Sequence, residues 1–211
     1  AASDVYKRQV NIPDFDIKNI ETYLKNDSTH NYNKNFTIEI VSENIFKINN
    51  KKIYLLNNRD ASQLNWKKYG INYVIDTTGV YLTYDKCFKH YVDYVIMCAP
   101  PKDNTLQFVY NVNNEKYSGE KIISNASCTT NCISPILKIL DENYKIEKAN
   151  FTTIHSMTAS QNTTDTNNFK NRTSRAIVNN IIPHTTGASK SITKLLPNLE
   201  GKIKGTSLRV P

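Results

Sequence analysis

Cys128 and His155 are the residues of this 211-residue chain best suited to nucleophilic chemistry. Cys128 lies between an expected strand over 121–124 and an expected amphipathic helix over 129–144. The free N–H groups at a helix start favour a thiolate and can bind an oxyanion or a phosphate. His155 ends the next expected strand, over 151–155, so strand–helix–strand geometry can return its imidazole to the sulfur as a base.

The same pair of residues fits several classes of protein. A buried structural cysteine at a helix start explains Cys128 as readily as a nucleophile does, and a Cys/His hydrolase would use the same two side chains. The other histidines, His30, His90 and His184, fall in expected loops or in an expected helix, where structural or solvated roles are more common. Local chemistry leaves these alternatives open.

The elements that must position these residues alternate between strand and helix. Strand character occurs over 36–41, 52–56, 73–76, 94–99, 107–112 and 121–124, and helical character over 80–91. This alternation is typical of an α/β fold with a mostly parallel, doubly wound sheet. After residue 124 the pattern changes to a helix over 129–144, a strand over 151–155, a long polar stretch over 156–182, a helix over 187–196 and a strand over 204–210.

We therefore expect a domain boundary at Ser124/Asn125. It separates a partial first domain, residues 1–124, from a partial second domain, residues 125–211. The stretch 1–9 shows no pattern that links it to the rest, and we interpret it as foreign.

Composition excludes several classes of protein. The formal net charge is +8, but the lysines are scattered as on a solvated surface, so nucleic acid is not expected as the primary partner. The four cysteines have neither CxxC nor zinc-ligand spacing, which indicates no metal site and a reducing, cytoplasmic compartment. No apolar run reaches the roughly 18–20 residues that a membrane-spanning helix needs.

The segment from Ser124 to Cys132, SNASCTTNC, resembles the active-site signature of the glyceraldehyde-3-phosphate dehydrogenase family. Further segments resemble the family at 27–30 (DSTH), 77–80 (TTGV), 112–117 (VNNEKY), 152–161 (TTIHSMTASQ), 180–188 (NIIPHTTGA) and 208–211 (LRVP). The resemblance implies an incomplete Rossmann-type NAD-binding domain followed by the first part of an α+β catalytic domain. It also identifies the chain as an internal fragment that lacks both termini.

The resemblance implies a phosphorylating oxidation in glycolysis. The family converts glyceraldehyde 3-phosphate, NAD and inorganic phosphate to 1,3-bisphosphoglycerate and NADH through a cysteine thioester. Cys128 would be the nucleophile and His155 its base. A cytoplasmic homotetramer is implied for the full-length protein.

Two anion sites are also implied by the resemblance. Ser127, Thr129, Thr186 and Gly187 match positions around the attacking phosphate, Thr158 and Arg209 match positions that hold the phosphate of the substrate, and Arg172 falls where a loop arginine reaches this region. The planar fork of an arginine matches phosphate oxygens. A solvated side chain is the alternative for Arg172.

The resemblance is weaker on the cofactor side. Arg59, Thr78 and Cys98 match positions near NAD. However, no GxGxxG turn occurs, and Ile12 stands where the family has an acid for the ribose, with Asp14 nearby. We therefore do not expect the fragment by itself to turn over.

Two rival functions stay open. A dehydrogenase of the same superfamily that prefers erythrose 4-phosphate would share these motifs. A catalytically inactive RNA-binding relative is supported only by the net charge of +8.

Overall fold

The computed structural model describes residues 9–27, 31–32, 36–167 and 172–211. The chain divides into two compact units. One consists of Ala1–Val74 with Phe88–Asp93, and the other of Ile75–Cys87 with Tyr94–Pro211. The domain boundary expected at Ser124/Asn125 lies within the second unit and stays a prediction, as does the foreign origin of residues 1–9.

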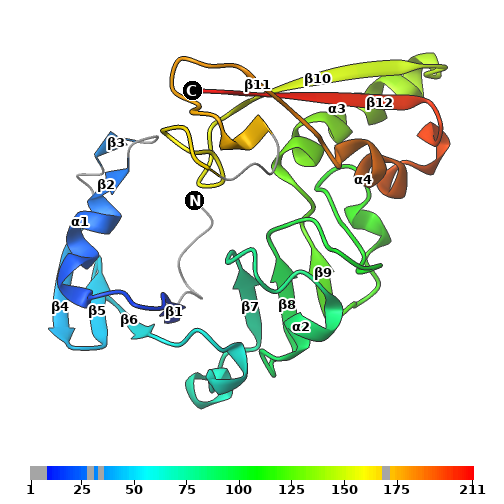
Figure 1. Ribbon diagram of the computed structural model, residues 1–211. Helices are drawn as coiled ribbons and strands as arrows, with labels where there is room; N and C mark the ends of the chain where they lie inside the picture. Colours follow the sequence, from blue (N-terminus) through cyan, green and yellow to red (C-terminus); the bar gives the residue numbers. More distant parts are fainter. Residues whose placement is uncertain (1–8, 28–30, 33–35, 168–171) are drawn as a thin grey trace. The chain divides into compact units, whose positions relative to one another are not determined.

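A four-stranded sheet in the order β1-β6-β5-β4 forms the centre of the first unit (Figure 1). Its strands are β1 (Gln9–Asn11), β4 (Ile38–Ser42), β5 (Ile45–Ile48) and β6 (Lys51–Leu56), and the 3₁₀ turn η1 (Ile17–Asn19) leads into helix α1 (Ile20–Lys25). Ile17 and Ile20 are buried together with Phe46 and Leu55 of the sheet, so the helical segment covers one of its faces. The smaller elements are β2 (Asn26–Asp27), β3 (Asn31–Tyr32), η2 (Ala61–Gln63) and η3 (Trp66–Tyr69).

The mostly parallel sheet predicted for this region is wrong over 38–56. Only the β1–β6 pair is parallel, whereas β4, β5 and β6 form an antiparallel meander. Strand β5 was not expected, yet the turn after it carries a sequence signal. Asn49 and Asn50 both adopt left-handed backbone conformations, with φ of 48° and 68°. Two such residues form the tight hairpin turn that matches the twist of paired strands.

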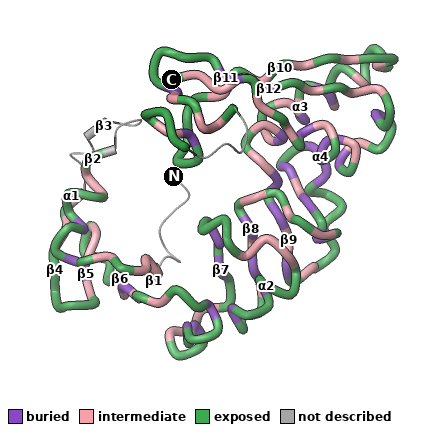
Figure 2. Tube along the Cα trace, in the orientation of Figure 1, coloured by how far each residue is buried: buried purple, intermediate pink, exposed green. Residues whose placement is uncertain are grey.

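A three-stranded sheet in the order β7-β8-β9 leads toward Cys128 in the second unit. Its strands are β7 (Tyr73–Asp76), which begins in the first unit, β8 (Tyr94–Met97) and β9 (Ile122–Ser124). β8 and β9 are parallel, and buried residues alternate along them (Figure 2). This arrangement confirms the α/β class expected for this part of the chain.

Two sequence-based predictions near this sheet are wrong. The helix expected over 80–91 is only α2 (Tyr84–Phe88), because the N–H of Val80 donates to Thr78 Oγ1 and the N–H of Tyr84 donates to the Asp103 carboxylate at 2.7 Å. The strand expected over 107–112 is a single bridge from Gln107 to Ser124. There the Asn113 amide oxygen accepts the N–H of Val109, and this side-chain contact bends the chain into a turn ahead of η4 (Asn114–Lys116).

The last part of the chain forms a mixed sheet in the order β10-β12-β11, packed on two helices. Its elements are α3 (Cys128–Tyr144), β10 (Ala149–Ser156), η5 (Arg172–Ser174), β11 (Ile182–His184), α4 (Ala188–Leu195), η6 (Pro197–Leu199) and β12 (Ile203–Val210). β10 and β12 run parallel and lie side by side in Figure 1. Leu137 of α3 is buried with Ala188 and Ile192 of α4, and Phe151 of β10 packs against this cluster, so the two helices and the sheet share one core.

Phe151 and Gly205 face each other across the β10–β12 pair. A Cβ atom placed on Gly205 would lie 2.3 Å from the Phe151 ring. The aromatic ring therefore occupies the space above the glycine, and it also contacts the buried cluster beneath the sheet. This contact favours the observed register of the two strands.

Candidate active site

Cys128 is the first residue of α3, and the turn before it is held by side chains. Ser127 is the N-cap, and its Oγ accepts the N–H of Thr130 at 3.1 Å. The Asn131 amide donates back to the carbonyl oxygens of Asn125, at 2.7 Å, and Ser127, at 3.0 Å. These bonds fix the direction in which the cysteine side chain leaves the helix start.

The Sγ of Cys128 lies 3.3 Å from Nε2 of His155. Cys128 is exposed, and His155 is half-buried near the end of β10. The alternative of a buried structural cysteine is therefore wrong. The geometry permits a proton to pass between the sulfur and the ring, and the start of α3 offers N–H groups beside it.

The neighbour of His155 on the adjacent strand is Arg209. The two residues are direct partners in the parallel register of β10 and β12. Arg209 Nη1 lies 2.5 Å from His155 Nδ1 and donates to the Ser156 carbonyl oxygen at 3.1 Å. The same carbonyl oxygen lies 2.7 Å from Nδ1. The family resemblance places Arg209 at the phosphate of the substrate, and no pattern in the sequence indicates its contact with the ring.

The carboxyl ends of β7, β8 and β9 bring two cofactor candidates to the edge that leads to Cys128. Asp76 ends β7 and accepts hydrogen bonds from the N–H and hydroxyl of Thr78 at 2.8 and 2.7 Å. The Asp76 carbonyl oxygen accepts the N–H of Cys98, at the end of β8, at 2.8 Å. Asn125, just after β9, donates to Met97 at 2.9 Å. The buried Asp76 was not singled out from the sequence, although an acid directly before a TTG turn is a usable signal.

Arg59 belongs to the first unit. Its side chain is 80% exposed and forms an ion pair with Asp14. Asp14, the nearby acid considered for the ribose, is thus engaged by the arginine. Asn58, next to Arg59, is tied to Asn11 of β1 by two hydrogen bonds of 2.8 and 3.0 Å. These bonds hold the segment that carries Arg59 against the end of β1.

The threonines and the glycine of the expected anion sites lie in the second unit. Thr158 is exposed, and its hydroxyl donates to Gln161 Oε1 at 2.9 Å. Thr186 accepts the N–H of Ala188 at the start of α4, at 3.2 Å. No described atom lies within 4 Å of the position of a Cβ on Gly187, so the space beside that residue is open. Thr129, the second residue of α3, is half-buried.

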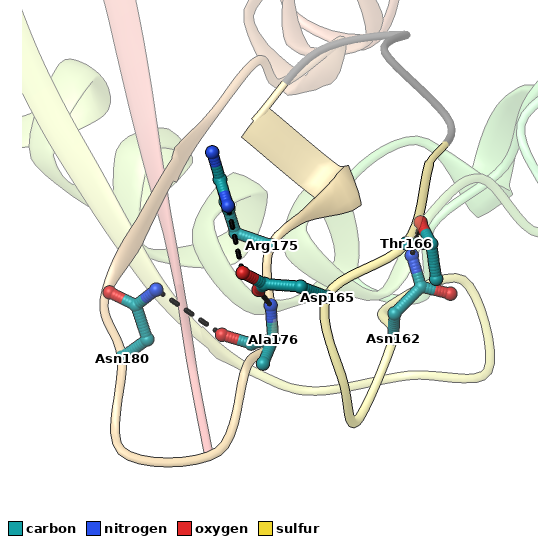
Figure 3. Close-up of polar contacts among 6 residues, drawn as sticks. All are labelled: Asn162, Asp165, Thr166, Arg175, Ala176 and Asn180. Atoms are coloured by element: carbon teal, nitrogen blue, oxygen red, sulfur yellow. Dashed lines mark hydrogen bonds and ion pairs between the residues drawn. The ribbon is translucent and has the colours of Figure 1, made fainter.

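The segment after β10 is held by its own polar contacts (Figure 3). The Asp165 carboxylate accepts the N–H of Ala176 at 2.9 Å and pairs with Arg175 at 2.7 Å. These two contacts hold the pKa of Asp165 below its ordinary value, the backbone N–H having the larger effect. Asn162 donates to the Thr173 carbonyl oxygen at 2.9 Å. Arg172 begins η5 with an exposed side chain, and its role at an anion site stays a prediction.

The cysteines differ in their surroundings. Cys87 is buried, and burial followed by the charges of Asp76 and Asp103 raises the pKa of its thiol to about 12. Burial and Asp76 also raise the pKa of the Cys98 thiol. Within the described ranges, no three His, Cys, Asp or Glu side chains gather as metal ligands, and no helix is both long and apolar enough to cross a bilayer.

Two family models match the chain. The NAD binding domain of glyceraldehyde 3-phosphate dehydrogenase matches residues 3–84, and the C-terminal domain of the same family matches residues 127–211. The glyceraldehyde-3-phosphate dehydrogenase of Buchnera aphidicola subsp. Schizaphis graminum is 43% identical over 201 residues, which are 93% of this chain and 60% of the relative.

Two further relatives are each 42% identical over 192 residues, covering 89% of this chain and 57% of their own length. They are the cytosolic glyceraldehyde-3-phosphate dehydrogenase of Leishmania mexicana and glyceraldehyde-3-phosphate dehydrogenase A of Escherichia coli strain K12. The chain therefore spans less than two thirds of these relatives. With both of its ends matched by domains of one family, the chain belongs to the glyceraldehyde-3-phosphate dehydrogenase family.

Proposed function

We propose that the full-length protein oxidises glyceraldehyde 3-phosphate with NAD and inorganic phosphate to 1,3-bisphosphoglycerate and NADH. The observation that carries this proposal is the 3.3 Å contact between Cys128 Sγ and His155 Nε2 at the start of α3. A thiolate at this position can attack an aldehyde carbon, and the ring can accept the proton that the reaction releases.

The chain's own residues account for the covalent steps. The Cys128 thiolate would add to the carbonyl carbon as the C=O π bond breaks, and the new alkoxide, which the N–H groups that begin α3 can stabilise, would take a proton from the His155 ring to give a hemithioacetal. His155 takes the hydroxyl proton as the C–H bond breaks, and a thioester on Cys128 remains. A phosphate oxygen then attacks the thioester carbon, and Cys128 leaves as a thiolate. A thioester suits this sequence because a weak nucleophile such as phosphate can still displace the sulfur.

A bound NAD would supply the acceptor for the hydride that leaves the carbon attached to Cys128. The carboxyl edge of β7 and β8 fits such a cofactor because it presents Thr78 and Cys98 beside the segment that leads to Cys128. We assign Arg59 to the adenine side on the family resemblance, supported by its exposed position. Thr78 and Cys98 would lie along the cofactor and orient it.

The anion sites follow from the same arrangement. We assign Ser127, Thr129, Thr186 and Gly187 to the attacking phosphate and Thr158, Arg172 and Arg209 to the phosphate of the substrate. The open space at Gly187 supports the first assignment, and the position of Arg209 beside His155 supports the second. Two separate anion sites are required because the aldehyde and the nucleophile each carry a phosphate group.

We further propose that the full-length protein is a cytoplasmic homotetramer that acts in glycolysis. The name of the relative from Leishmania mexicana, which is called cytosolic, supports the compartment. Size-exclusion chromatography with light scattering of the full-length protein tests the tetramer, and a monomer would contradict it.

Steady-state NADH formation by the full-length protein tests the reaction. With glyceraldehyde 3-phosphate and NAD, sustained turnover should require inorganic phosphate. Erythrose 4-phosphate should give slower NADH formation than glyceraldehyde 3-phosphate. Faster oxidation of erythrose 4-phosphate without phosphate would contradict the proposal. So would phosphate-independent ester hydrolysis blocked by iodoacetamide and unaffected by NAD, which a Cys/His hydrolase would give.

A further inference from the structure

Gln107 and Ser191 form a buried polar pair within the second unit. The Ser191 hydroxyl donates to Gln107 Oε1 at 2.8 Å, and both residues are only 8% exposed. The other buried residues of α4 are apolar, namely Ala188, Ile192 and Leu195. A buried hydroxyl on such a helix face is unfavourable unless it has a partner, so this hydrogen bond specifies how α4 packs against Gln107.

The backbone of Gln107 is held beside the strand that leads to Cys128. Gln107 forms a parallel bridge with Ser124, the last residue of β9. The Ser124 N–H donates to the Leu106 carbonyl oxygen, and the Phe108 N–H donates to the Ser124 carbonyl oxygen, both at 2.9 Å. Gln107 is therefore fixed to the end of β9, from which a short turn leads to Cys128.

Ser191 is tied in the same way to the start of α4. Its N–H donates to the Gly187 carbonyl oxygen at 3.2 Å. The N–H groups at the start of a helix are available to an anion, and the proposed function assigns Thr186 and Gly187 to the attacking phosphate. Hydrogen bonds therefore connect β9, Gln107, Ser191 and Gly187 in that order.

Apolar packing joins the same two regions at the other end of α4. One buried cluster consists of Val109, Val112, Ala126 and Leu195. Leu195 is the last residue of α4, so this cluster holds the last turn of the helix. Apolar contacts have no preferred direction, whereas a hydrogen bond has a preferred distance and angle. The bond between Gln107 and Ser191 thus fixes the first half of the helix more closely than packing does.

We infer that Gln107 is a positioning residue for the step in which phosphate attacks the thioester. The inference rests on the proposed function for the reaction and for the phosphate site. Attack requires a phosphate oxygen to lie about 3–3.5 Å from the thioester carbon and in the right direction. Cys128 carries that carbon and the start of α4 carries the phosphate, so the connection from β9 to Gly187 sets their separation. Formation of the thioester uses Cys128 and His155 and does not depend on this connection.

A single-turnover experiment on the full-length protein separates the two steps. The protein is mixed with glyceraldehyde 3-phosphate and NAD without phosphate, and the burst of NADH gives the rate of thioester formation. Loss of the thioester is then followed by acid quench and peptide mass spectrometry, with and without added phosphate. The reaction without phosphate gives the rate of hydrolysis by water.

The Gln107→Met variant keeps the length of the side chain but offers no oxygen as an acceptor. We expect cleavage of its thioester by phosphate to be about five- to tenfold slower, because one buried hydrogen bond is lost. The NADH burst and the hydrolysis by water should change little. Equal slowing of all three rates would indicate a general loss of packing and would overturn the inference, and so would cleavage by phosphate at the normal rate.

Ser191→Ala tests the same bond from α4. It removes a single oxygen atom, so it provides the test even if Gln107→Met does not fold. Its effect should equal that of Gln107→Met, and a variant with both substitutions should be no slower than either alone, because both remove one shared bond. Effects that multiply in the double variant would overturn the inference.

Thr193→Val is the matched control on the same helix. The Thr193 hydroxyl donates to the Lys190 carbonyl oxygen at 3.1 Å, so its hydrogen bond stays within α4. This variant loses a hydroxyl without losing the connection to Gln107. Its thioester should be cleaved by phosphate at the rate of the unmodified protein, and a slowing as large as that of Ser191→Ala would overturn the inference.

The outcome can be separated from that of the proposed function. If the unmodified protein forms no thioester, or if phosphate does not speed its cleavage, the reaction assignment fails and the role of Gln107 fails with it. If phosphate cleaves the thioester equally fast in the unmodified protein, Gln107→Met and Ser191→Ala, the role of Gln107 fails alone.

Discussion

Two regions of the second unit hold candidate site residues by different means. Cys128, His155 and Arg209 lie on α3, β10 and β12. The helix start brings Cys128 Sγ to 3.3 Å from His155 Nε2, and the strand register brings Arg209 Nη1 to 2.5 Å from His155 Nδ1. The polar stretch that follows β10 is instead held by exposed side-chain contacts such as the Asp165–Arg175 pair (Figure 3). A single exposed substitution rarely shifts a helix start or a strand register, whereas the loss of one side-chain contact can change the conformation of a loop. We therefore expect substitutions in the first region to stop the chemistry and those in the second to adjust it.

Cys128→Ser should have the largest effect. A hydroxyl is a far poorer nucleophile than a thiolate at neutral pH, so NADH formation by the full-length protein should fall by at least about a thousandfold. Cys132→Ser is the matched control, because Cys132 is also exposed and lies one turn further along α3. It should keep most of the activity. Substantial NADH formation by the Cys128→Ser variant would contradict the expectation that substitutions in the first region stop the chemistry.

His155→Asn should have the next largest effect. Loss of a general base typically costs about 10²–10⁴ in rate, and kcat should fall by an amount in this range. Binding of glycerol 3-phosphate, measured by calorimetry, should change little, because the anion site retains Arg209. A variant that loses phosphate binding but keeps kcat would show that the ring serves the anion rather than the sulfur.

Much of this first region was predictable from residue types. Helix α3 and strand β10 follow from apolar spacing and from polar caps, and the pairing of Cys128 with His155 follows from strand–helix–strand geometry. The contact between His155 and Arg209 was not predicted, because it depends on the register of two strands that are 54 residues apart. A register is set by packing, here in part by Phe151 over Gly205, and the sequence pattern of either strand does not contain it.

Gly205→Ala tests that register. The added methyl group would overlap the Phe151 ring, so we expect a loss of about 1–3 kcal/mol in the free energy of unfolding. Denaturant unfolding of the full-length protein measures this loss. Gly187→Ala is the control for stability, because its Cβ would meet nothing within 4 Å. Equal stability of the two variants would show that the glycine does not set the register.

Asp165→Ala tests the second region and should have the smallest effect. Contacts with the Ala176 N–H and Arg175 lower the pKa of the Asp165 carboxyl in the folded protein. The stabilisation is therefore present above the ordinary value of 3.8 and is lost as the pH falls through the lowered value. At neutral pH the variant should exchange the Ala176 amide hydrogen about fivefold faster or more, because the charge-assisted bond is absent.

Hydrogen exchange read at Ala176 measures this effect, with Glu147→Ala as a control that removes an exposed acid elsewhere. Unchanged exchange at Ala176 would indicate that the backbone, rather than Asp165, holds the segment. The kcat of the Asp165 variant should fall by less than about tenfold, a change of roughly 1.4 kcal/mol in barrier height.

The second region was the least predictable part of the site. Its polar, aperiodic sequence indicates a long loop but not the partners of its side chains, because hydrogen bonds of this kind have no period in the sequence. On the cofactor side, the strands before Thr78 and Cys98 were expected, whereas the role of Asp76 in joining the two positions was not. The hairpin of β5 and β6 depends on the turn chemistry of Asn49-Asn50 rather than on apolar spacing.

The most direct test of the account is a search for the covalent intermediate. The full-length protein would be mixed with glyceraldehyde 3-phosphate and NAD in the absence of inorganic phosphate, quenched in acid and examined by peptide mass spectrometry. The account predicts a 3-phosphoglyceroyl thioester on the peptide that carries Cys128. The thioester should form together with NADH and should be cleaved when phosphate is added before the quench. An acyl group on another cysteine, or NADH formation with Cys128 unmodified throughout, would contradict it.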